Sequence, residues 1–287
     1  MQPTPARPAK DADADADAAA PQPALVHSLA KGLEILSVFS EGDLLGNQQL
    51  VALTGLPKAT VSRLTSTLVQ LGYLRTDPLT RRYFMGTRLL GMGLSVQRKL
   101  GLLKVARPYM QQLSEDTGLT VSLGTRDRLG LALLEVLLPP QNNRLVVNAD
   151  VGTVLPIAST AIGLAYIVAA PVKERSQILE GLRRRFPDEW PAMRANVERA
   201  HADFAEHGFV ITQGSWGRDV NGAAAPLLLD ERNVLYSFHC AGPASRMPLA
   251  RIRKDIGPRL VALVAEVRAA MRQAPRPRLN PPGLYEP

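Results

Sequence analysis

The sequence predicts an α+β protein with two ordered domains, an N-terminal winged helix-turn-helix and a C-terminal α/β domain. The 287 residues exceed the roughly 100–200 residues of one domain, and 46% of them are apolar, enough for two cores. Three short helical patterns punctuated by glycines precede a short hairpin between residues 47 and 86. From residue 102 to about 272, helical and strand patterns alternate.

The two ends of the chain, 1–24 and 273–287, are expected to be disordered tails. The first alternates aspartate with alanine from Asp11 to Asp17 between prolines, and the second is rich in proline. Such segments bury too little apolar surface to offset the entropy of ordering them. The acidic run either competes with DNA for a basic surface or is an inert leader.

Composition narrows the class of protein. The formal net charge of +8 fits a polyanionic partner such as double-stranded DNA, although many other proteins are also basic. A single cysteine, Cys240, excludes an intrachain disulfide framework, and the four histidines show no metal-ligand spacing, so we expect neither metal nor cofactor. Because the chain shows neither a long apolar run nor a signal peptide, we expect a cytoplasmic protein with no membrane partner.

The expected DNA-binding domain covers residues 25–86. Its first helix carries Leu29, Leu33 and Leu36 at helical spacing, widened by Ile35, Val38 and Phe39. Asn47 is the expected N-cap of the second helix. The third helix follows Pro57, runs to about Leu71 and ends at Gly72. Two short strands, 73–76 and 82–85, flank a turn at Asp77-Pro78 and form the wing.

The third helix has the character of a recognition helix. Val61, Leu64, Leu68 and Leu71 are expected on its buried face, and the opposite face is short, polar or basic. Arginine can read guanine bidentately, while a basic wing suits phosphates or the minor groove. The alternatives are a winged-helix domain used for protein contact and, for Arg63, a merely solvated side chain. The DNA-contact candidates are Asn47, Gln48, Lys58, Ala59, Thr60, Ser62, Arg63, Ser66, Arg75, Arg81, Arg82 and Tyr83.

A linker helix is expected over residues 87–101. Leu89, Met92, Val96 and Leu103 either form a seam against a partner helix or pack on their own domain. Beyond it, a domain over 102–272 is expected to contain helices at 103–116, 159–170, 172–184 and 192–207 and strands at 119–125, 130–137, 144–148, 208–213, 222–229 and 233–241. A final amphipathic helix carries Ile252, Ile256, Leu260, Val264, Val267 and Met271.

Several segments together resemble the IclR family of bacterial transcriptional regulators. Residues 53–74, LTGLPKATVSRLTSTLVQLGYL, are similar to its helix-turn-helix, 28–36 to its first helix and 83–90 to the exit of its wing. The likeness continues at 155–163, LPIASTAIG, and at 208–210, 221–226 and 241–243. The resemblance implies a GAF-like effector-binding domain, a homodimer or dimer of dimers, and a small organic acid or aromatic acid as effector.

The resemblance also suggests where the effector binds. Pro156 precedes an expected helix start whose free N–H groups and dipole favour a carboxylate, although an ordinary capped helix start is the alternative. Trp216 either covers an aromatic ligand or packs on the domain, and Arg218 pairs either with the ligand or with Asp219. His239 is either a ligand contact or a core histidine. The effector-binding candidates are Val147, Ser159, Thr160, Ala161, Ile162, Thr212, Trp216, Val220, Gly222, His239 and Ala241.

The chain departs from the family pattern in this expected pocket. Ala158 stands where a histidine is common, Leu164 where a basic residue is common, and Thr212-Gln213 where many members carry an acidic residue. His239 and Ala241 occupy a strand that often carries serine. The expected pocket therefore has no dependable fixed cation, and the helix terminus is expected to supply much of the affinity for an anion.

An enzyme is not expected, because the sequence has no Gly-x-Ser-x-Gly elbow and no phosphate-binding loop of the P-loop or Rossmann type. An architectural DNA-binding protein without ligand control is the other alternative, and about 170 residues of mixed α/β sequence argue against it. The expected function is therefore sequence-specific regulation of transcription from a pseudo-palindromic operator, controlled by a small carboxylate or aromatic acid and governing a catabolic operon.

Overall fold

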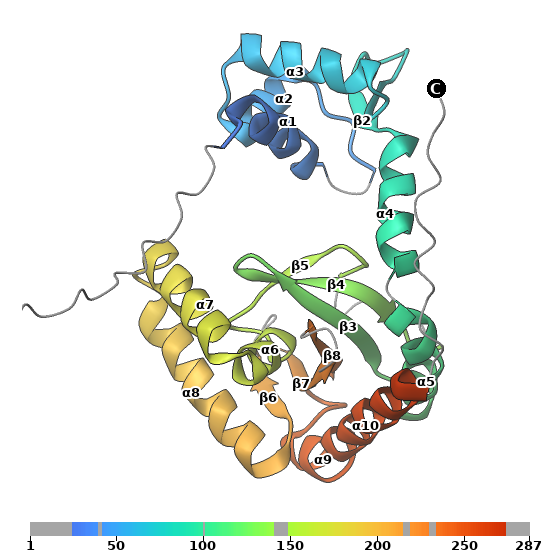
Figure 1. Cartoon of the computed structure of the whole chain (residues 1–287), viewed down its shortest axis with the longest axis vertical. Coiled ribbons are helices and arrows are strands. Elements are labelled where there is room, and N and C mark those ends of the chain that lie inside the picture. Colours follow the sequence, from blue (N-terminus) through green and yellow to red (C-terminus); the bar gives the residue numbers. More distant parts are fainter. Residues whose placement is uncertain are drawn as a thin grey trace, which may run out of the picture. The chain divides into compact units, whose positions relative to one another are not determined.

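A computed structural model describes residues 25–39, 42–99, 101–140, 149–214, 219–229 and 234–273, with only the backbone described at 94–99. The tails expected at 1–24 and beyond residue 273, and the strand expected at 144–148, lie outside these residues. The chain divides into two compact units, Met1–Leu94 and Ser95–Pro287. Each unit is described by itself (Figure 1).

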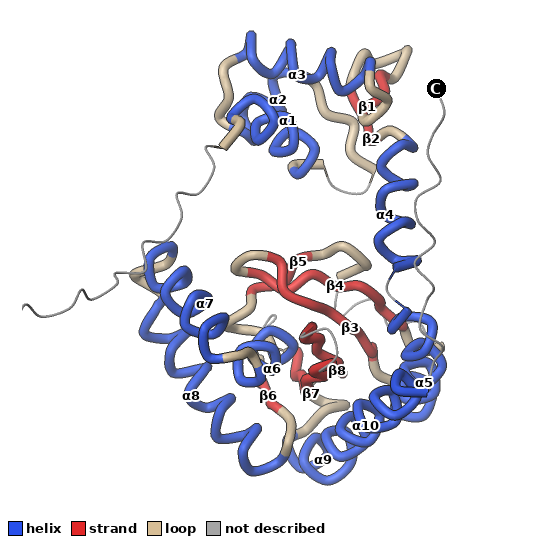
Figure 2. The backbone as a smooth tube through the Cα atoms, in the orientation of Figure 1, coloured by secondary structure: helices blue, strands red, loops and turns tan. Residues whose placement is uncertain are grey.

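The first unit consists of helices around one core and a hairpin wing (Figure 2). Helices α1 (His27–Ser37), α2 (Asn47–Thr54) and α3 (Lys58–Gln70) pack around one core. Ile35, Leu50, Val61 and Leu74 are almost completely buried there. At the turn between α2 and α3, Gly55 has a φ of +67°, a left-handed conformation that glycine adopts without strain. The helix-turn-helix expected from the sequence is therefore present.

Two of the sequence expectations for α1 and α2 are wrong. Leu29 and Leu33 of α1 are 62% and 57% exposed, and the side facing the core consists of Gly32, Ile35 and Leu36. Gly32 lies at the close approach to α3, where a Cβ would be 3.9 Å from Leu64 Cδ2. Asn47 is the first residue of α2 rather than its N-cap.

The N-cap of α2 is Gly46, and its N–H donates to Gln49 Oε1 at 2.9 Å. On α3, the expectation for Leu71 is also wrong, because this residue follows the helix and is 48% exposed. Thr65 takes a place in the core instead. Its hydroxyl is satisfied inside the helix because Oγ1 donates to the Val61 carbonyl at 2.9 Å.

The wing is a hairpin of β1 (Leu74–Thr76) and β2 (Tyr83–Met85), extended by an isolated bridge from Leu45 to Tyr83. The Asp77 carboxylate accepts a hydrogen bond from the Thr80 N–H at 2.9 Å and another from the Thr80 hydroxyl. These bonds favour the charged carboxylate and hold the pKa of Asp77 below its ordinary value. The wing tip is thus ordered by Asp77, and Arg81 follows it with a φ of +58°.

Helix α4 (Thr87–Lys99) begins directly after the wing. Its first turn is fixed by Arg88, whose Nη1 donates to the Leu71 carbonyl at 3.1 Å while the guanidinium lies over the Tyr73 ring. Of the two alternatives for the expected apolar seam, packing within the chain itself is present at two positions. Leu89 packs on the core of the first unit and Leu103 is buried in the core of the second. The Val96 side chain lies outside the described residues.

The second unit is built on one antiparallel sheet with the order β5-β4-β3-β8-β7-β6. Its strands are β3 (Thr120–Asp127), β4 (Gly130–Leu137), β5 (Val154–Pro156), β6 (Val210–Gln213), β7 (Val220–Leu229) and β8 (Val234–Pro243). The short strand β5 was not expected from the sequence. The class of fold, α+β with an α/β C-terminal domain, is as expected.

Helices cover both faces of this sheet (Figure 1). Helices α5 (Gly101–Thr117) and α10 (Gly257–Gln273) pack on one face, and α6 (Ala161–Ala169) packs on the other, with α7 (Val172–Arg185) and α8 (Trp190–His207) outside it. Because successive strand residues point to opposite faces, Phe238 and Cys240 enter the core under α10, while Ala224 and Leu235 face α6. Cys240 is in the core, as expected.

The C-terminal helix is interrupted. A short α9 (Leu249–Arg251) leads into a π-helical turn, Ile252–Ile256, before α10 begins at Gly257. Pro258 has no N–H to continue the helical ladder, and a Cβ on Gly257 would lie 2.1 Å from the Phe209 ring. The apolar residues expected on this helix, from Ile252 to Val267, are buried as the periodicity predicted.

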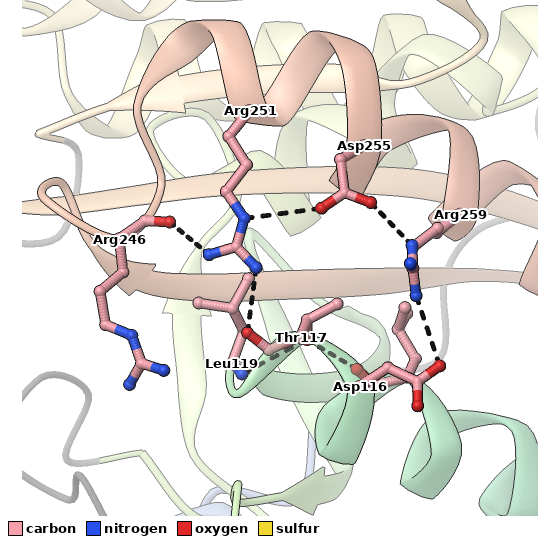
Figure 3. A network of polar contacts seen from close by, with 8 residues as sticks. Asp116, Thr117, Leu119, Arg246, Arg251, Asp255 and Arg259 are labelled. Atoms are coloured by element: carbon pink, nitrogen blue, oxygen red, sulfur yellow. Dashed lines mark hydrogen bonds and ion pairs between the residues drawn. The ribbon is translucent and has the colours of Figure 1, made fainter.

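A polar network ties this interrupted helix to the end of α5 (Figure 3). Arg251 donates to the carbonyls of Arg246 and Thr117 at 2.7 and 3.1 Å. Asp255 bridges Arg251 to Arg259, and Arg259 reaches Asp116 at 3.3 Å. The network uses the carbonyls around the α5 C-terminus, which a helix end leaves without partners.

Candidate functional site

The outer face of α3 presents the residues expected to meet DNA. Lys58, Ala59, Ser62, Arg63 and Ser66 are all exposed, on the side of the helix opposite Val61 and Leu68. Thr60 is half-buried. The Arg63 guanidinium extends from a helix face of short side chains, which is the shape that permits close approach to a DNA groove.

The N-terminus of α2 lies beside this surface in the helix-turn-helix. Gln48 is exposed, whereas Asn47 is half-buried and its Oδ1 is buried with no hydrogen-bond partner among the described residues. Because its side-chain oxygen is buried, Asn47 is less available for a direct contact with DNA than the exposed Gln48.

The wing carries exposed cations. Arg75, Arg81 and Arg82 are exposed, while Tyr83 is half-buried against the core. Arg75 lies over the Phe84 ring at 5.7 Å from its centroid. Leu79, at the tip, is 91% exposed and was not singled out from the sequence. The described first unit therefore presents one polar and basic helix face and one basic hairpin.

In the second unit, four of the expected effector residues meet at Gly222. A Cβ added to Gly222 would lie 2.7 Å from His239 Nε2, 3.3 Å from Thr212 Oγ1 and 3.4 Å from Ala161 Cβ. The pairing of β6 with β7 and of β7 with β8 aligns Thr212, Gly222 and Ala241 across the sheet. The absence of a side chain at Gly222 is what lets His239, Thr212 and Ala161 approach the backbone this closely.

His239 is held in a defined orientation. Its Nδ1 lies 3.2 Å from Ser122 Oγ on the adjacent strand β3, so Nε2 is the nitrogen that lies against Gly222. Burial lowers the pKa of His239 to about 4, because the charged imidazolium would lose its hydration. The ring is therefore neutral at neutral pH and offers a polar but uncharged nitrogen.

The start of α6 differs from the expectation. The helix begins at Ala161, and Thr160 is its N-cap, with Oγ1 accepting from the Gly163 N–H at 3.4 Å and donating to the Pro156 carbonyl at 2.8 Å. Thr160, Ala161 and Ile162 are buried, and only Ser159 is partly exposed. The ordinary capped helix start, the alternative reading of the sequence, is thus present.

A cavity of about 390 Å³ adjoins this cluster and supplies cations that the sequence did not point to. Ser159 and Thr212 line it, and so do Arg199 of α8 and Arg253 of the π-helical turn. The expected effector residues themselves include no arginine or lysine, whereas this neighbouring cavity is lined by two arginines. The remaining lining residues are Leu164, Asn196, Ala202, Asp203, Ile211, Gln213 and Leu249.

Two polar residues shape this cavity. Asn196 Nδ2 donates to the Ala158 carbonyl at 3.1 Å, and its Oδ1 accepts a hydrogen bond from Arg199 Nη2. Asp203 accepts the N–H of Ile211 at 3.2 Å, so the acidic group is engaged with the edge strand. Asn196 of α8 thus both holds the Arg199 guanidinium and anchors the turn before α6 through the Ala158 carbonyl.

The other expected effector residues are distributed differently. Val220 and Ala241 are buried in the sheet, and Val147 and Trp216 lie outside the described residues. Within the described part of the chain, no group of His, Cys, Asp and Glu side chains could hold a metal ion. No described helix is long and apolar enough to span a membrane.

Comparison with known proteins agrees with both units. The model of the IclR helix-turn-helix domain matches residues 28–78, and that of the bacterial transcriptional regulator IclR C-terminal domain matches residues 94–269. The HTH-type transcriptional regulator TsaQ1/TsaQ2 of Comamonas testosteroni is 57% identical over 258 residues, which cover 90% of this chain and 93% of the relative.

Two further relatives support the same assignment. The DNA-binding transcriptional repressor YiaJ of Escherichia coli is 30% identical over 79% of this chain and 81% of its own. The crystal structure of an IclR family regulator from Brucella abortus matches with a TM-score of 0.77 and 38% identity, over 88% of this chain and 96% of that one. These relatives are regulators rather than enzymes, and the chain belongs to the IclR family of DNA-binding bacterial transcriptional regulators.

Proposed function

We propose that this regulator binds a pseudo-palindromic operator as a homodimer or dimer of dimers, and that a small organic acid in its C-terminal domain controls this binding. The operon it governs is catabolic. The observation that carries the proposal is the meeting of His239 Nε2, Thr212 Oγ1 and Ala161 around the bare backbone of Gly222. This polar cluster adjoins a cavity through Thr212, in a domain separate from the helix-turn-helix, and such a cavity is suited to a small ligand.

The DNA contacts are assigned to the exposed face of α3 and to the wing. Arg63 reads base edges and Ser62 and Ser66 approach bases or phosphates, while Arg75, Arg81 and Arg82 meet the backbone. Arg88 is exposed as well, but its guanidinium is engaged by the Leu71 carbonyl and the Tyr73 ring. Its role is therefore structural.

A mobility-shift comparison tests the assignment of Arg63. Arg63→Ala should lose about 1–3 kcal/mol of discrimination between operator and scrambled DNA, while binding to scrambled DNA persists. Arg184→Ala is the matched control, because it also removes an exposed positive charge, but from the other unit. An unchanged ratio of operator to scrambled affinity in Arg63→Ala would leave this residue without a reading role.

The acidic character of the effector is supported by the cavity beside the Gly222 cluster. Arg199 and Arg253 line the cavity together with one acidic residue, Asp203. The Asp203 carboxylate already accepts a hydrogen bond from the backbone. A carboxylate that enters this cavity can pair with a guanidinium, which binds it with two parallel hydrogen bonds. Thr212 lines the cavity and also lies at the Gly222 cluster, so it joins the two regions.

Calorimetry on the full chain tests the effector site with a screen of small mono- and dicarboxylates. A homologue from Microbacterium hydrocarbonoxydans, 21% identical, was solved in complex with 4-hydroxybenzoate, and we include this compound. Arg199→Gln and Arg253→Gln should each weaken binding of a carboxylate more than that of its neutral amide. Arg184→Gln is the control. If the amide binds as tightly as the acid, the site selects on apolar shape and not on charge.

The dimer is supported by an apolar stripe on α1. Leu29 and Leu33 of α1 are four residues apart and are both exposed, and so are Leu25 and Val26, which precede the helix. Exposed apolar stripes of this kind mark protein contacts. Leu33→Glu should therefore shift the chain toward monomers in sedimentation, whereas Leu53→Glu, equally exposed on α2, should not. Identical sedimentation of both variants would remove this stripe from the interface.

A further inference from the structure

The second unit contains another cavity, between α7 and α8, which has no part in the proposed effector site. Its volume is about 530 Å³, within the range of small-molecule sites. None of the residues that line it lines the cavity at Ser159 and Thr212. The two helices follow one another along the chain and lie outside α6 (Figure 1).

The floor of this α7–α8 cleft is apolar. It consists of Leu179 from α7 and of Trp190 and Val197 from α8. Val197 is buried, while Leu179 and Trp190 are half-buried and pack against the same core as α6. A half-buried indole and a leucine side by side offer a flat surface for an aromatic ring.

The rim of the cleft is cationic. Arg175, Arg183 and Arg194 line it, against one acid, Glu198. Glu198 is taken by Arg194, whose Nε lies 2.8 Å from Oε1. Arg175 Nη1 has one long bond, at 3.4 Å, to the Val168 carbonyl. The cleft therefore retains an excess of positive charge.

Arg183 is the most available of these cations. Among the described residues it makes no hydrogen bond and no ion pair, unlike its neighbour Arg184, which pairs with Glu180. His201 lies in the same lining and does not add a charge at neutral pH, because burial and the nearby Arg175 lower its pKa. An anion in the cleft would thus meet guanidinium groups without displacing an acidic partner from Arg183 or Arg175.

We propose that the α7–α8 cleft is a second ligand site, which takes a planar aromatic molecule carrying one anionic group. The ring lies on Trp190 and Leu179, and the carboxylate or sulfonate pairs with Arg183 and Arg175. An apolar floor with a guanidinium rim matches both parts of such a molecule, since arginine binds planar anions bidentately. A polyanion such as nucleic acid would leave the apolar floor uncovered.

Fluorescence of the full chain tests this site with 8-anilinonaphthalene-1-sulfonate. The chain has two tryptophans, so in a Trp216→Phe background the energy transferred to the probe comes from Trp190 alone. We expect saturable transfer whose dissociation constant rises about tenfold in Arg183→Gln, the loss of one charge-assisted pair. Arg184→Gln, one residue along the same helix and outside the lining, should stay within about twofold.

A neutral analogue and a second variant keep the outcomes distinct. N-phenyl-1-naphthylamine lacks the sulfonate and should bind about tenfold more weakly than the sulfonate. Equal binding of the two probes, or equal weakening in Arg183→Gln and Arg184→Gln, would overturn the proposal. So would a signal lost in Gly222→Ala and unaffected by Arg183→Gln, since the probe would then occupy the effector site. Binding that falls as protein concentration rises would assign the cleft to a second copy of the chain instead.

Discussion

Replacing Gly222 with alanine probes the proposed effector site with a single methyl group. In the structure that methyl would lie 2.7 Å from His239 Nε2, whereas favourable contacts between such atoms begin at about 3.5 Å. The gap is therefore short by nearly an ångström. Thr212 Oγ1 and Ala161 Cβ, at 3.3 and 3.4 Å, limit escape in the other directions.

The imidazole is the group that must move. Tilting it away weakens the contact to Ser122, worth about 1 kcal/mol, and forces the side chain off its preferred rotamer, at about 0.5–1.5 kcal/mol. Gly222→Ala should therefore destabilise the protein by about 1.5–2.5 kcal/mol. For a domain of this size, that lowers the melting temperature by roughly 3–10 °C.

Thermal unfolding and a mobility-shift assay measure the two consequences separately. The variant should melt earlier, bind operator DNA within about twofold of the wild type, and lose at least tenfold in its response to the effector. Adding His239→Ala removes the clash and should restore part of the stability. Gly101→Ala is the control for a generic glycine effect, because its Cβ would meet no atom within 4 Å.

One pair of results would refute this reasoning. If Gly222→Ala melts with the wild type and still responds to the effector, the ligand does not occupy the space above this residue. A variant that melts early but responds normally would keep the packing argument and remove Gly222 from the site.

Three further predictions concern proton binding, packing and DNA. The pKa of His239 is about 4 in the folded chain and about 6.5 when unfolded, so the free energy of unfolding should fall by up to roughly 3 kcal/mol as pH drops from about 6.5 to 4. His239→Gln should reduce this fall in the free energy of unfolding, as measured by urea titration at each pH. A fall of the same size in the variant would show that other groups cause it. A Cβ on Gly86 would lie 2.1 Å from the Gly72 carbonyl oxygen, so Gly86→Ala should cost about 2 kcal/mol or more by calorimetry, and an unchanged melting temperature would contradict this. Arg81→Ala and Arg82→Ala should weaken binding to all DNA sequences alike and lower the salt slope by about 1, whereas relaxation at one base pair would indicate that the wing reads sequence.

The helix-turn-helix was predictable because its signals are local. Period 3.6 and a turn glycine identify α3 and its exposed face. The same periodicity failed on α1, where several apolar residues compete for the core. Gly32 rather than Leu29 or Leu33 faces α3, where a Cβ on Gly32 would be in van der Waals contact with Leu64. Apolar spacing does not show which of two apolar stripes meets another helix.

In the effector domain too, features set by local sequence were predictable, and features set by the packing of distant segments were not. Strand alternation places Gly222 and Ala224 on one face of β7, and the approach of Thr212 and His239 to Gly222 follows once the strands are paired. Ala161 joins them only because α6 packs on β7. Arg199 and Arg253, by contrast, come from two helices far apart in the chain. Nothing in their local sequence directs them to one cavity, because that depends on how α8 and the π-helical turn pack on the edge strand.

The proposed effector site combines a cationic cavity with the neutral imidazole of His239. This difference in chemistry predicts which ligands bind more tightly. The cavity at Arg199 and Arg253 suits a carboxylate, and Thr212 joins it to the cluster that contains His239 Nε2. Because neutral His239 uses Nδ1 toward Ser122, Nε2 either donates or accepts, according to which tautomer is present.

A hydroxyl group can meet both tautomers, since it donates and accepts. We therefore expect an aromatic acid with a hydroxyl group opposite its carboxylate to bind more tightly than the same acid without it. One hydrogen bond to a neutral partner is worth about 1 kcal/mol, so 4-hydroxybenzoate should exceed benzoate by about fivefold in calorimetry. His239→Phe should abolish the difference while benzoate still binds. If the variant retains the preference for the hydroxylated acid, the hydroxyl group lies elsewhere and Nε2 does not contact the effector.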